Sequence, residues 1–261
     1  MPVKPPPAVP RPAATVVLLR DRPGGGCEAL LIRRHEKSRF AAGDFVFPGG
    51  RTEPEDAPAD AARWCRGLDD ASAARRLGLD APGALAYWVA AIREAFEEVG
   101  LLLACDASGR PASLVPARLA EGRRACQRDH RAFWTLLREE NLALPVDRLV
   151  YFAHWITPEE RPLRFDTRFF AAEAPAGQDA EPDMHEITAV RWLTPAEALA
   201  ARARGEISLR LPTATNLSLF DGAPSAAAAL ERLIGWGPRN GPHPPVVLGA
   251  PRPSPGTPRR P

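Results

Sequence analysis

The sequence predicts an α/β fold in which a mixed β-sheet lies between helices. Apolar, β-branched segments of strand length alternate along the chain with longer segments whose apolar residues recur every three or four positions. The chain has 261 residues, of which 45% are hydrophobic, so it can bury a sizeable core. Prolines are concentrated at both ends, with six in residues 1–12 and nine in residues 237–261. We therefore expect one domain over residues 13–236, between a disordered N-terminal segment (1–12) and a flexible proline-rich tail (237–261).

Five segments have the composition of strands, namely residues 13–20, 28–34, 149–156, 165–172 and 187–193. The first two are separated by Asp-Arg-Pro-Gly-Gly-Gly at residues 21–26. Because proline and glycine favour turns, we expect these two strands to pair as a hairpin.

Five other segments have helical periodicity, namely residues 59–77, 85–99, 123–140, 195–204 and 224–235. In the second of these, Leu85, Val89, Ile92 and Phe96 form an apolar stripe that predicts burial of one side of the helix. Gly100 follows where a glycine commonly ends a helix.

The other side of that helix carries three carboxylates, Glu94, Glu97 and Glu98, at positions i, i+3 and i+4. Like charges at these spacings destabilise a helix by roughly 0.2–0.5 kcal/mol per pair, so we expect positive charge nearby. Arg93 can reach Glu97 one turn further on. Carboxylate oxygens also suit Mg²⁺ and Mn²⁺, whose remaining positions are commonly filled by water and substrate phosphate.

The order Arg-Glu-x-x-Glu-Glu-x-Gly at residues 93–100 resembles the second half of the Nudix box. The first half resembles residues 47–56, where Gly50 opens the box and Asp56 stands where the family usually has glutamate. Asp56 and Arg93 are separated by 36 residues, 29 more than in the family pattern. We place a helical insertion at residues 57–85. Because the entropy of loop closure grows only logarithmically with length, the two halves can still meet.

The resemblance implies the Nudix α/β/α sandwich, with the insertion and C-terminal helices added to it. It also implies hydrolysis of a diphosphate by water. Glu94, Glu97 and Glu98, with the backbone carbonyl of Gly49, would hold one to three Mg²⁺ or Mn²⁺ ions that lower the pKa of the attacking water. Arg93 would orient Glu97.

Two further acidic residues have roles that stay open. Asp56 keeps the carboxylate of the family's glutamate but has a shorter reach. Glu186 lies at the start of a predicted strand, where some Nudix enzymes place an additional metal ligand or base, although a strand-edge charge is an equally good interpretation. The carboxylate that accepts the proton of the attacking water is not identified by the sequence.

Residues 30–50 resemble the motif of coenzyme A diphosphatases within the Nudix family. The matching positions are Leu30, Leu31, Arg34, Arg39, Gly43, Phe47, Pro48, Gly49 and Gly50. The resemblance implies that Arg34 and Arg39 bind the substrate, since arginine side chains bind phosphate oxygens through paired hydrogen bonds. Coenzyme A carries a 3′-phosphate beside its diphosphate, so an additional cation would have a partner.

Residues 154–170 and 185–199 are similar to the C-terminal half of animal acyl-coenzyme A diphosphatases, which also carry an insertion in the box. We therefore expect a coenzyme A derivative as substrate, with 3′,5′-ADP and (acyl-)phosphopantetheine as products. One alternative is a Nudix hydrolase of another nucleoside diphosphate, such as ADP-ribose or NADH. A second alternative is a non-catalytic module that senses a nucleotide, which has no need of three mutually repelling carboxylates.

Composition limits the other classes of function. A formal net charge of +2 gives no indication of nucleic acid or membrane as partner. The four cysteines lack the spacing of a zinc site. No apolar run approaches the ~20 residues of a membrane span, and the N-terminus lacks the apolar stretch of a signal peptide. We expect a cytoplasmic protein that binds a small-molecule nucleotide diphosphate, and a homodimer stays open.

Overall fold

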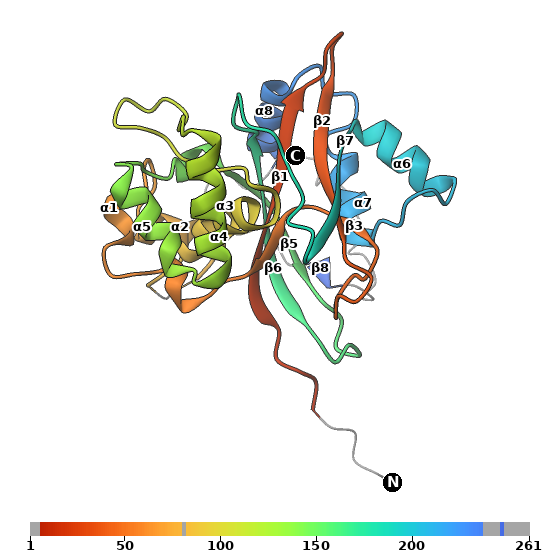
Figure 1. Ribbon diagram of the computed structural model, residues 1–261. Coiled ribbons are helices and arrows are strands. Elements are labelled where there is room, and N and C mark those ends of the chain that lie inside the picture. Colours follow the sequence, from red (N-terminus) through yellow and green to blue (C-terminus); the bar gives the residue numbers. More distant parts are fainter. Residues whose placement is uncertain (1–5, 80–81, 237–245, 248–261) are drawn as a thin grey trace, which may run out of the picture.

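The computed structural model describes residues 6–79, 82–236 and 246–247. Within these residues, eight strands form one sheet in the order β3-β2-β1-β6-β5-β8, with β4 beside β1 and β7 beside β2 (Figure 1). The long strands are β1 (Arg11–Asp21), β2 (Cys27–Arg34), β5 (Val150–Ile156), β6 (Phe165–Glu173) and β7 (Ile187–Leu193). The short strands are β3 (Phe45–Val46), β4 (Gly49–Arg51) and β8 (Val246–Val247). Strand β1 is parallel to β6 and antiparallel to β2, so the predicted mixed sheet and its first hairpin are confirmed.

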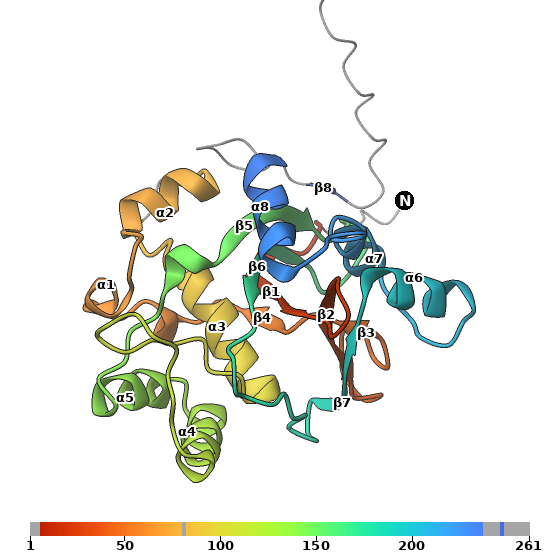
Figure 2. The same ribbon diagram turned by 90° about the horizontal axis from the view of Figure 1, so that it is seen from above.

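Helices cover both faces of the sheet (Figure 2). One layer contains α1 (Ala61–Trp64), α2 (Asp70–Leu77), α3 (Ala86–Val99), α4 (Pro116–Arg128) and α5 (Arg131–Glu139). The other contains α6 (Pro195–Ala203), α7 (Leu211–Ser218) and α8 (Ala226–Trp236). Strand β1 contributes to both cores because successive side chains point to opposite faces. Val16 and Leu18 pack on the α3 side and Val17 and Leu19 on the α8 side, and all four are fully buried.

Strands β1 and β2 separate as they leave their turn. Near the turn, Leu19 of β1 pairs with Ala29 of β2. Farther from the turn, Ala14 of β1 pairs instead with Gly50 of β4. At the same level, Arg33 of β2 pairs with Phe45 of β3. The chain that joins β3 to β4 therefore enters between the two long strands, and this places the glycines of β4 beneath the C-terminal half of α3.

Two of the predicted helices are wrong in the same way, because each is divided in the structure. Between α1 and α2, Cys65 pairs with Leu144 and the Arg66 amide donates to the Leu144 carbonyl at 2.8 Å. Between α4 and α5, Asp129 is extended and its carboxylate accepts the Arg131 amide at 3.0 Å. Local periodicity does not report tertiary partners, and a short acidic side chain competes for backbone hydrogen bonds.

Six of the described elements were not predicted: helix α7, the short strands β3, β4 and β8, and the 3₁₀ turns η1 (Pro54–Asp56) and η2 (Val146–Arg148). Proline in the first turn of α7 was a usable signal for its start. The longest described helix, α3, has 14 residues, and none of the described helices is long and apolar enough to cross a membrane.

The N-terminal segment enters the sheet two residues before the predicted strand, since Arg11 and Pro12 pair with Phe165 and Asp166. The carbonyl of Ala8 accepts Arg164 Nη1 at 2.7 Å. Residues 1–5 lie outside the described part of the chain. So does the expected tail at 237–261, apart from strand β8, which pairs with the end of β5.

Candidate active site

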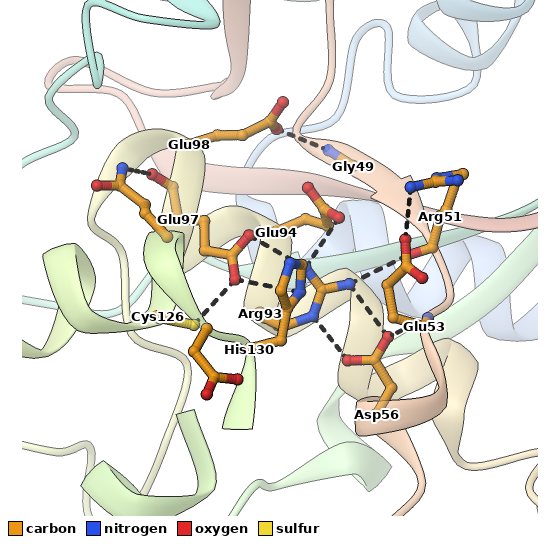
Figure 3. A network of polar contacts seen from close by, with 12 residues as sticks. Gly49, Arg51, Glu53, Asp56, Arg93, Glu94, Glu97, Glu98, Cys126 and His130 are labelled. Atoms are coloured by element: carbon orange, nitrogen blue, oxygen red, sulfur yellow. Dashed lines mark hydrogen bonds and ion pairs between the residues drawn. The ribbon is translucent and has the colours of Figure 1, made fainter. Parts of the chain in front are cut away.

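Arg93 lies at the centre of an acidic cluster between α3 and the turn after β4 (Figure 3). Its side chain is 1% exposed. Nε and Nη2 donate to the two carboxylate oxygens of Asp56, at 2.7 and 3.1 Å. Nη2 also donates to the Arg51 carbonyl at 3.0 Å, and Nη1 donates to Glu94 and Glu97 at 3.0 and 3.1 Å. A guanidinium group has five N–H donors, and all five have an acceptor here. One buried cation thus joins the two halves of the interrupted box.

Asp56 forms the end of η1 and is buried. Both of its oxygens face Arg93, in the bidentate arrangement that matches a carboxylate to a guanidinium group. One of these oxygens also accepts the backbone amide of Glu53 at 2.8 Å. The shorter aspartate therefore reaches the arginine, and in this arrangement it holds Arg93 in place.

Glu94 lies against the backbone of β4. A Cβ atom built on Gly50 would be 2.4 Å from Glu94 Oε1, so a side chain at this position would displace the carboxylate from where it lies. Glu97 uses one oxygen for Arg93, while its other oxygen is 2.9 Å from Cys126 Sγ. The side chains of both glutamates are largely buried, at 15% and 12% exposed.

Glu98 is buried at the end of the same helix and faces the start of β4. Its Oε2 accepts the Gly49 amide at 2.9 Å, and its Oε1 is 3.4 Å from Arg34 Nη1. A side chain at Gly49 would collide with the β1 backbone, because its Cβ would lie 2.5 Å from the Ala14 carbonyl. The contact seen at Gly49 is made by its amide, whereas the sequence suggested a role for its carbonyl.

Burial changes the acidity of this cluster. Burial raises the pKa of Glu94 to about 7, because the attraction of Arg93 does not offset burial together with repulsion from Glu97. Burial and then repulsion from Glu94 raise the pKa of Glu98 well above its ordinary value. Burial and the charge of Glu97 also raise the pKa of the Cys126 thiol. Each shift arises first from burial and then from neighbouring negative charge.

A divalent cation fits the charge of this cluster. In the described part of the chain, ion pairs join four carboxylates, those of Asp56 and the three glutamates of α3, to two guanidinium groups, those of Arg93 and Arg34. When all are ionised, two negative charges remain. Among the described residues, no three His, Cys, Asp or Glu side chains are already arranged around one metal position.

Arg34 and Glu186 are brought to this cluster by the pairing of β2 with β7. Arg34 Nη2 is 3.6 Å from Glu186 Oε2, on the side away from Glu98. Its Nε is buried and has no hydrogen-bond partner in the described structure. Glu186 itself is 68% exposed. Arg34 thus presents an incompletely bonded guanidinium group beside the carboxylates.

Arg39 lies apart from the cluster, in the loop between β2 and β3. It is exposed and forms no hydrogen bond or ion pair with any residue that the structure describes. The structure therefore brings together all the predicted site residues except Arg39, whose side chain is free to meet a ligand.

An open pocket of about 370 Å³ adjoins the Asp56 turn on the side of α5. It is lined by Pro54, Glu55, Pro58, Arg131, Trp134 and Arg138. The Trp134 indole donates to the Glu55 carbonyl at 2.7 Å, so α5 supports the turn that carries Asp56.

Sequence reasoning missed four residues that contact the last turn of α3: Arg123, Cys126, Gln127 and His130. They lie on α4 and just beyond its end, about 30 residues from the glutamates. No local pattern links them to the box, because their contact depends on how α4 folds back against α3.

The sequence is similar to known proteins of the Nudix family. The sequence model of the NUDT19 Nudix domain matches residues 70–219, which include α3 but not the first half of the box. The acyl-coenzyme A diphosphatase NUDT19 of Gallus gallus is 31% identical over 255 residues, covering 77% of this chain and 65% of the relative. The protein of the same name from Homo sapiens is 28% identical over 237 residues, covering 77% and 62%. The chain thus spans less than two thirds of the length of these relatives.

A solved structure gives the same fold. The Nudix hydrolase from Alicyclobacillus acidocaldarius is 29% identical, with a TM-score of 0.71 over 85% of this chain and 96% of that one. The predicted α/β/α sandwich is therefore confirmed. Because the family match covers more than half of the sequence, including the carboxylate-bearing helix, the chain belongs to the NUDT19 Nudix domain family.

Proposed function

We propose that this chain is a divalent-metal-dependent hydrolase that cleaves the diphosphate linkage of coenzyme A or acyl-coenzyme A. The products are 3′,5′-ADP and (acyl-)phosphopantetheine. The observation that carries the proposal is the buried acidic cluster with two unbalanced negative charges beside the incompletely bonded Arg34. The relatives' name, acyl-coenzyme A diphosphatase, supports the choice of substrate.

Glu94, Glu97 and Glu98, with the backbone carbonyl of Gly49, are the residues that would hold Mg²⁺ or Mn²⁺. When bound, such ions neutralise the diphosphate and lower the pKa of the attacking water. Arg93 orients Glu94 and Glu97 through Nη1. Asp56 supports this arrangement because it fixes the arginine on the opposite side.

The substrate is bound by arginines outside the box. Arg34 lies next to Glu98 and its side chain is 20% exposed, so its guanidinium group can donate to an oxygen of the diphosphate. Arg39 has no partner in the described structure, and we assign it to the 3′-phosphate. Glu186 restrains Arg34 from the solvent side and is available as an additional metal ligand or base.

The test is product analysis by mass spectrometry. Purified protein and Mg²⁺ or Mn²⁺ are incubated in parallel with coenzyme A, acetyl-coenzyme A, ADP-ribose and NADH. Preferential formation of 3′,5′-ADP supports the proposal. Preferential formation of AMP from ADP-ribose or NADH would mean that the substrate is another nucleoside diphosphate and not coenzyme A. If no product forms but a nucleotide binds tightly, the chain is a nucleotide-sensing module and the proposed hydrolase activity is wrong.

We also propose which partners the chain has and in which compartment it acts. The ligand is a small-molecule nucleotide diphosphate, with no role for nucleic acid or a membrane, and the compartment is the cytoplasm. A homodimer is tested directly by light scattering of the purified chain.

A further inference from the structure

Helix α4 contacts the end of the carboxylate-bearing helix α3 with residues from one of its sides. Arg123, Cys126 and Gln127 are spaced i, i+3 and i+4, so they lie on the same helix surface. His130 continues this line just before α5. All four point to the turn that carries Glu97.

Two of these residues bind the backbone of α3. Arg123 Nε donates to the Glu97 carbonyl at 3.0 Å, and its Nη2 donates to the Glu98 carbonyl at 2.7 Å. The Gln127 amide donates to the Glu97 carbonyl at 2.8 Å. The last four carbonyls of a helix have no partner within the helix. Here α4 supplies donors to the carbonyls of both glutamates.

The third residue binds a side chain. Cys126 Sγ is 2.9 Å from Glu97 Oε1, a distance at which the thiol donates to the carboxylate. His130 Nδ1 lies 3.6 Å from the same oxygen. Because the other Glu97 oxygen accepts Arg93 Nη1, the carboxylate is held at both ends (Figure 3). Cys126 itself is fully buried.

Arg123 also connects α3 to the segment that carries Glu186. Its Nη2 donates to the Glu181 carbonyl at 3.0 Å, and the Glu181 amide donates to the Val99 carbonyl at 3.0 Å. Beyond this point, the carboxylate of Asp183 accepts the amide of Glu186 at 3.0 Å. One guanidinium group therefore fixes two acid-bearing elements relative to each other.

We propose that this side of α4 positions the carboxylates of the site. Cys126 is the positioning residue for the Glu97 carboxylate, and Arg123 is the positioning residue for the last turn of α3. The inference rests on the proposed function, since these carboxylates need fixed positions only if they bind a divalent ion.

The first experiment compares Cys126→Ala, Cys126→Ser and wild type, with Cys105→Ala as control. Cys105 is also a buried thiol, but it has no contact with the acidic cluster. Mn²⁺ affinity is measured by calorimetry without substrate, together with kcat, KM and thermal unfolding. We expect Cys126→Ala to lose roughly 10–100-fold in Mn²⁺ affinity and in kcat, with little change in KM, as for other residues that orient metal ligands. Cys126→Ser retains a donor and should recover most of the loss.

The second experiment compares Arg123→Gln with Arg124→Gln. Arg124 is the exposed neighbour on the same helix, without a partner among the described residues. Hydrogen exchange of residues 96–101 reports on the last turn of α3 whether or not the protein turns over a substrate. We expect faster exchange and weaker Mn²⁺ binding for Arg123→Gln only.

The outcomes separate this inference from the proposed function. If the wild type cleaves none of the diphosphates but Cys126→Ala still weakens Mn²⁺ binding, the proposed substrate is wrong and the positioning role stands. If Cys126→Ala lowers the unfolding temperature while Mn²⁺ affinity and kcat equal those of Cys105→Ala, the thiol is merely structural and the inference is overturned. A wild type that binds no Mn²⁺ overturns both.

Discussion

At the scale of single residues, the site depends on how buried charges are paired. Arg93 has an acceptor for every N–H, and removing a partner from such a buried group costs about 3–5 kcal/mol. The buried charge of Glu98 has fewer partners, since its carboxylate accepts one backbone amide and lies 3.4 Å from Arg34 Nη1. The residues with the least complete pairing are therefore those that face the expected ligand.

Glu98→Gln should abolish turnover while preserving the fold. Glutamine can still accept the Gly49 amide, but it removes a buried charge that would bind the metal ion. We expect kcat to fall by more than roughly 100-fold and the melting temperature to stay equal or rise. Steady-state kinetics and thermal unfolding test this, with the exposed Glu231→Gln as control. Unchanged activity would remove Glu98 from the metal site.

Glu94 should make the metal-free protein less stable as the pH rises. Its pKa is raised from 4.5 to about 7 in the folded state, so the folded protein binds this proton more tightly than the unfolded chain. The stabilisation is complete below about pH 4.5 and is lost as the pH rises through about 7. Thermal unfolding in a chelator should therefore give a higher melting temperature at about pH 5 than at about pH 7.5. Glu94→Gln should flatten this dependence, and an identical slope in the variant would contradict the assignment.

Arg34 and Arg39 should differ in the phosphate that they recognise. Arg39→Ala should raise KM for coenzyme A about tenfold, with a smaller effect on dephospho-coenzyme A, because it meets the 3′-phosphate. Arg34→Ala should impair both substrates equally, because it meets the shared diphosphate. Parallel kinetics on the two substrates decide this. Equal effects of Arg39→Ala on both would assign Arg39 to the diphosphate or to structure.

At the scale of elements, the insertion in the box is built into the main core. Asp56 and Arg93 are separated by 36 residues, yet their side chains are 2.7 Å apart. The intervening chain does not form a separate unit, because Leu68, Ala73 and Leu77 belong to the same core cluster as α3. The carboxylate of Asp70 also accepts the Leu85 amide at 3.0 Å, which joins α2 to the start of α3.

Leu77→Ala should therefore destabilise the whole fold by about 2–5 kcal/mol, as for other buried leucines. The side chain is 2% exposed in the core that includes α3. Urea unfolding measures the change, and Leu211→Ala, at a half-exposed leucine, provides the control. A loss below about 0.5 kcal/mol would mean that the insertion is an independent appendage.

At the scale of the whole molecule, the acidic site lies between the sheet, where β1 and β2 separate, and the layer formed by α3, α4 and α5. A ligand that binds only the folded state stabilises the entire domain. At a hundred times its dissociation constant, Mn²⁺ should add about 2.7 kcal/mol, which raises the melting temperature of a chain of this size by about 5–10 °C. Differential scanning calorimetry with and without Mn²⁺ tests this, with Glu98→Gln as control. An equal increase in that variant would place the ion elsewhere.

The sequence by itself determined the α/β class, the five long strands, the extent of α3 and the three glutamates on it. These features depend on local periodicity and on motif spacing, which a single chain displays directly. The same patterns predicted one helix in place of α1 and α2, and one in place of α4 and α5. Local periodicity does not reveal the pairing of Cys65 with Leu144 or the hydrogen bond from the Arg131 amide to Asp129, which divide these helices.

Only the tertiary structure decided how the site is assembled. In the folded chain, Asp56 binds Arg93. The pairing of β2 with β7 places Arg34 between Glu98 and Glu186. Arg39 does not contact this cluster. Helix α4 lies against the last turn of α3. The physical reason is that these contacts join residues about 30 to 150 positions apart. Their formation depends on sheet register and helix packing, which local sequence patterns do not encode.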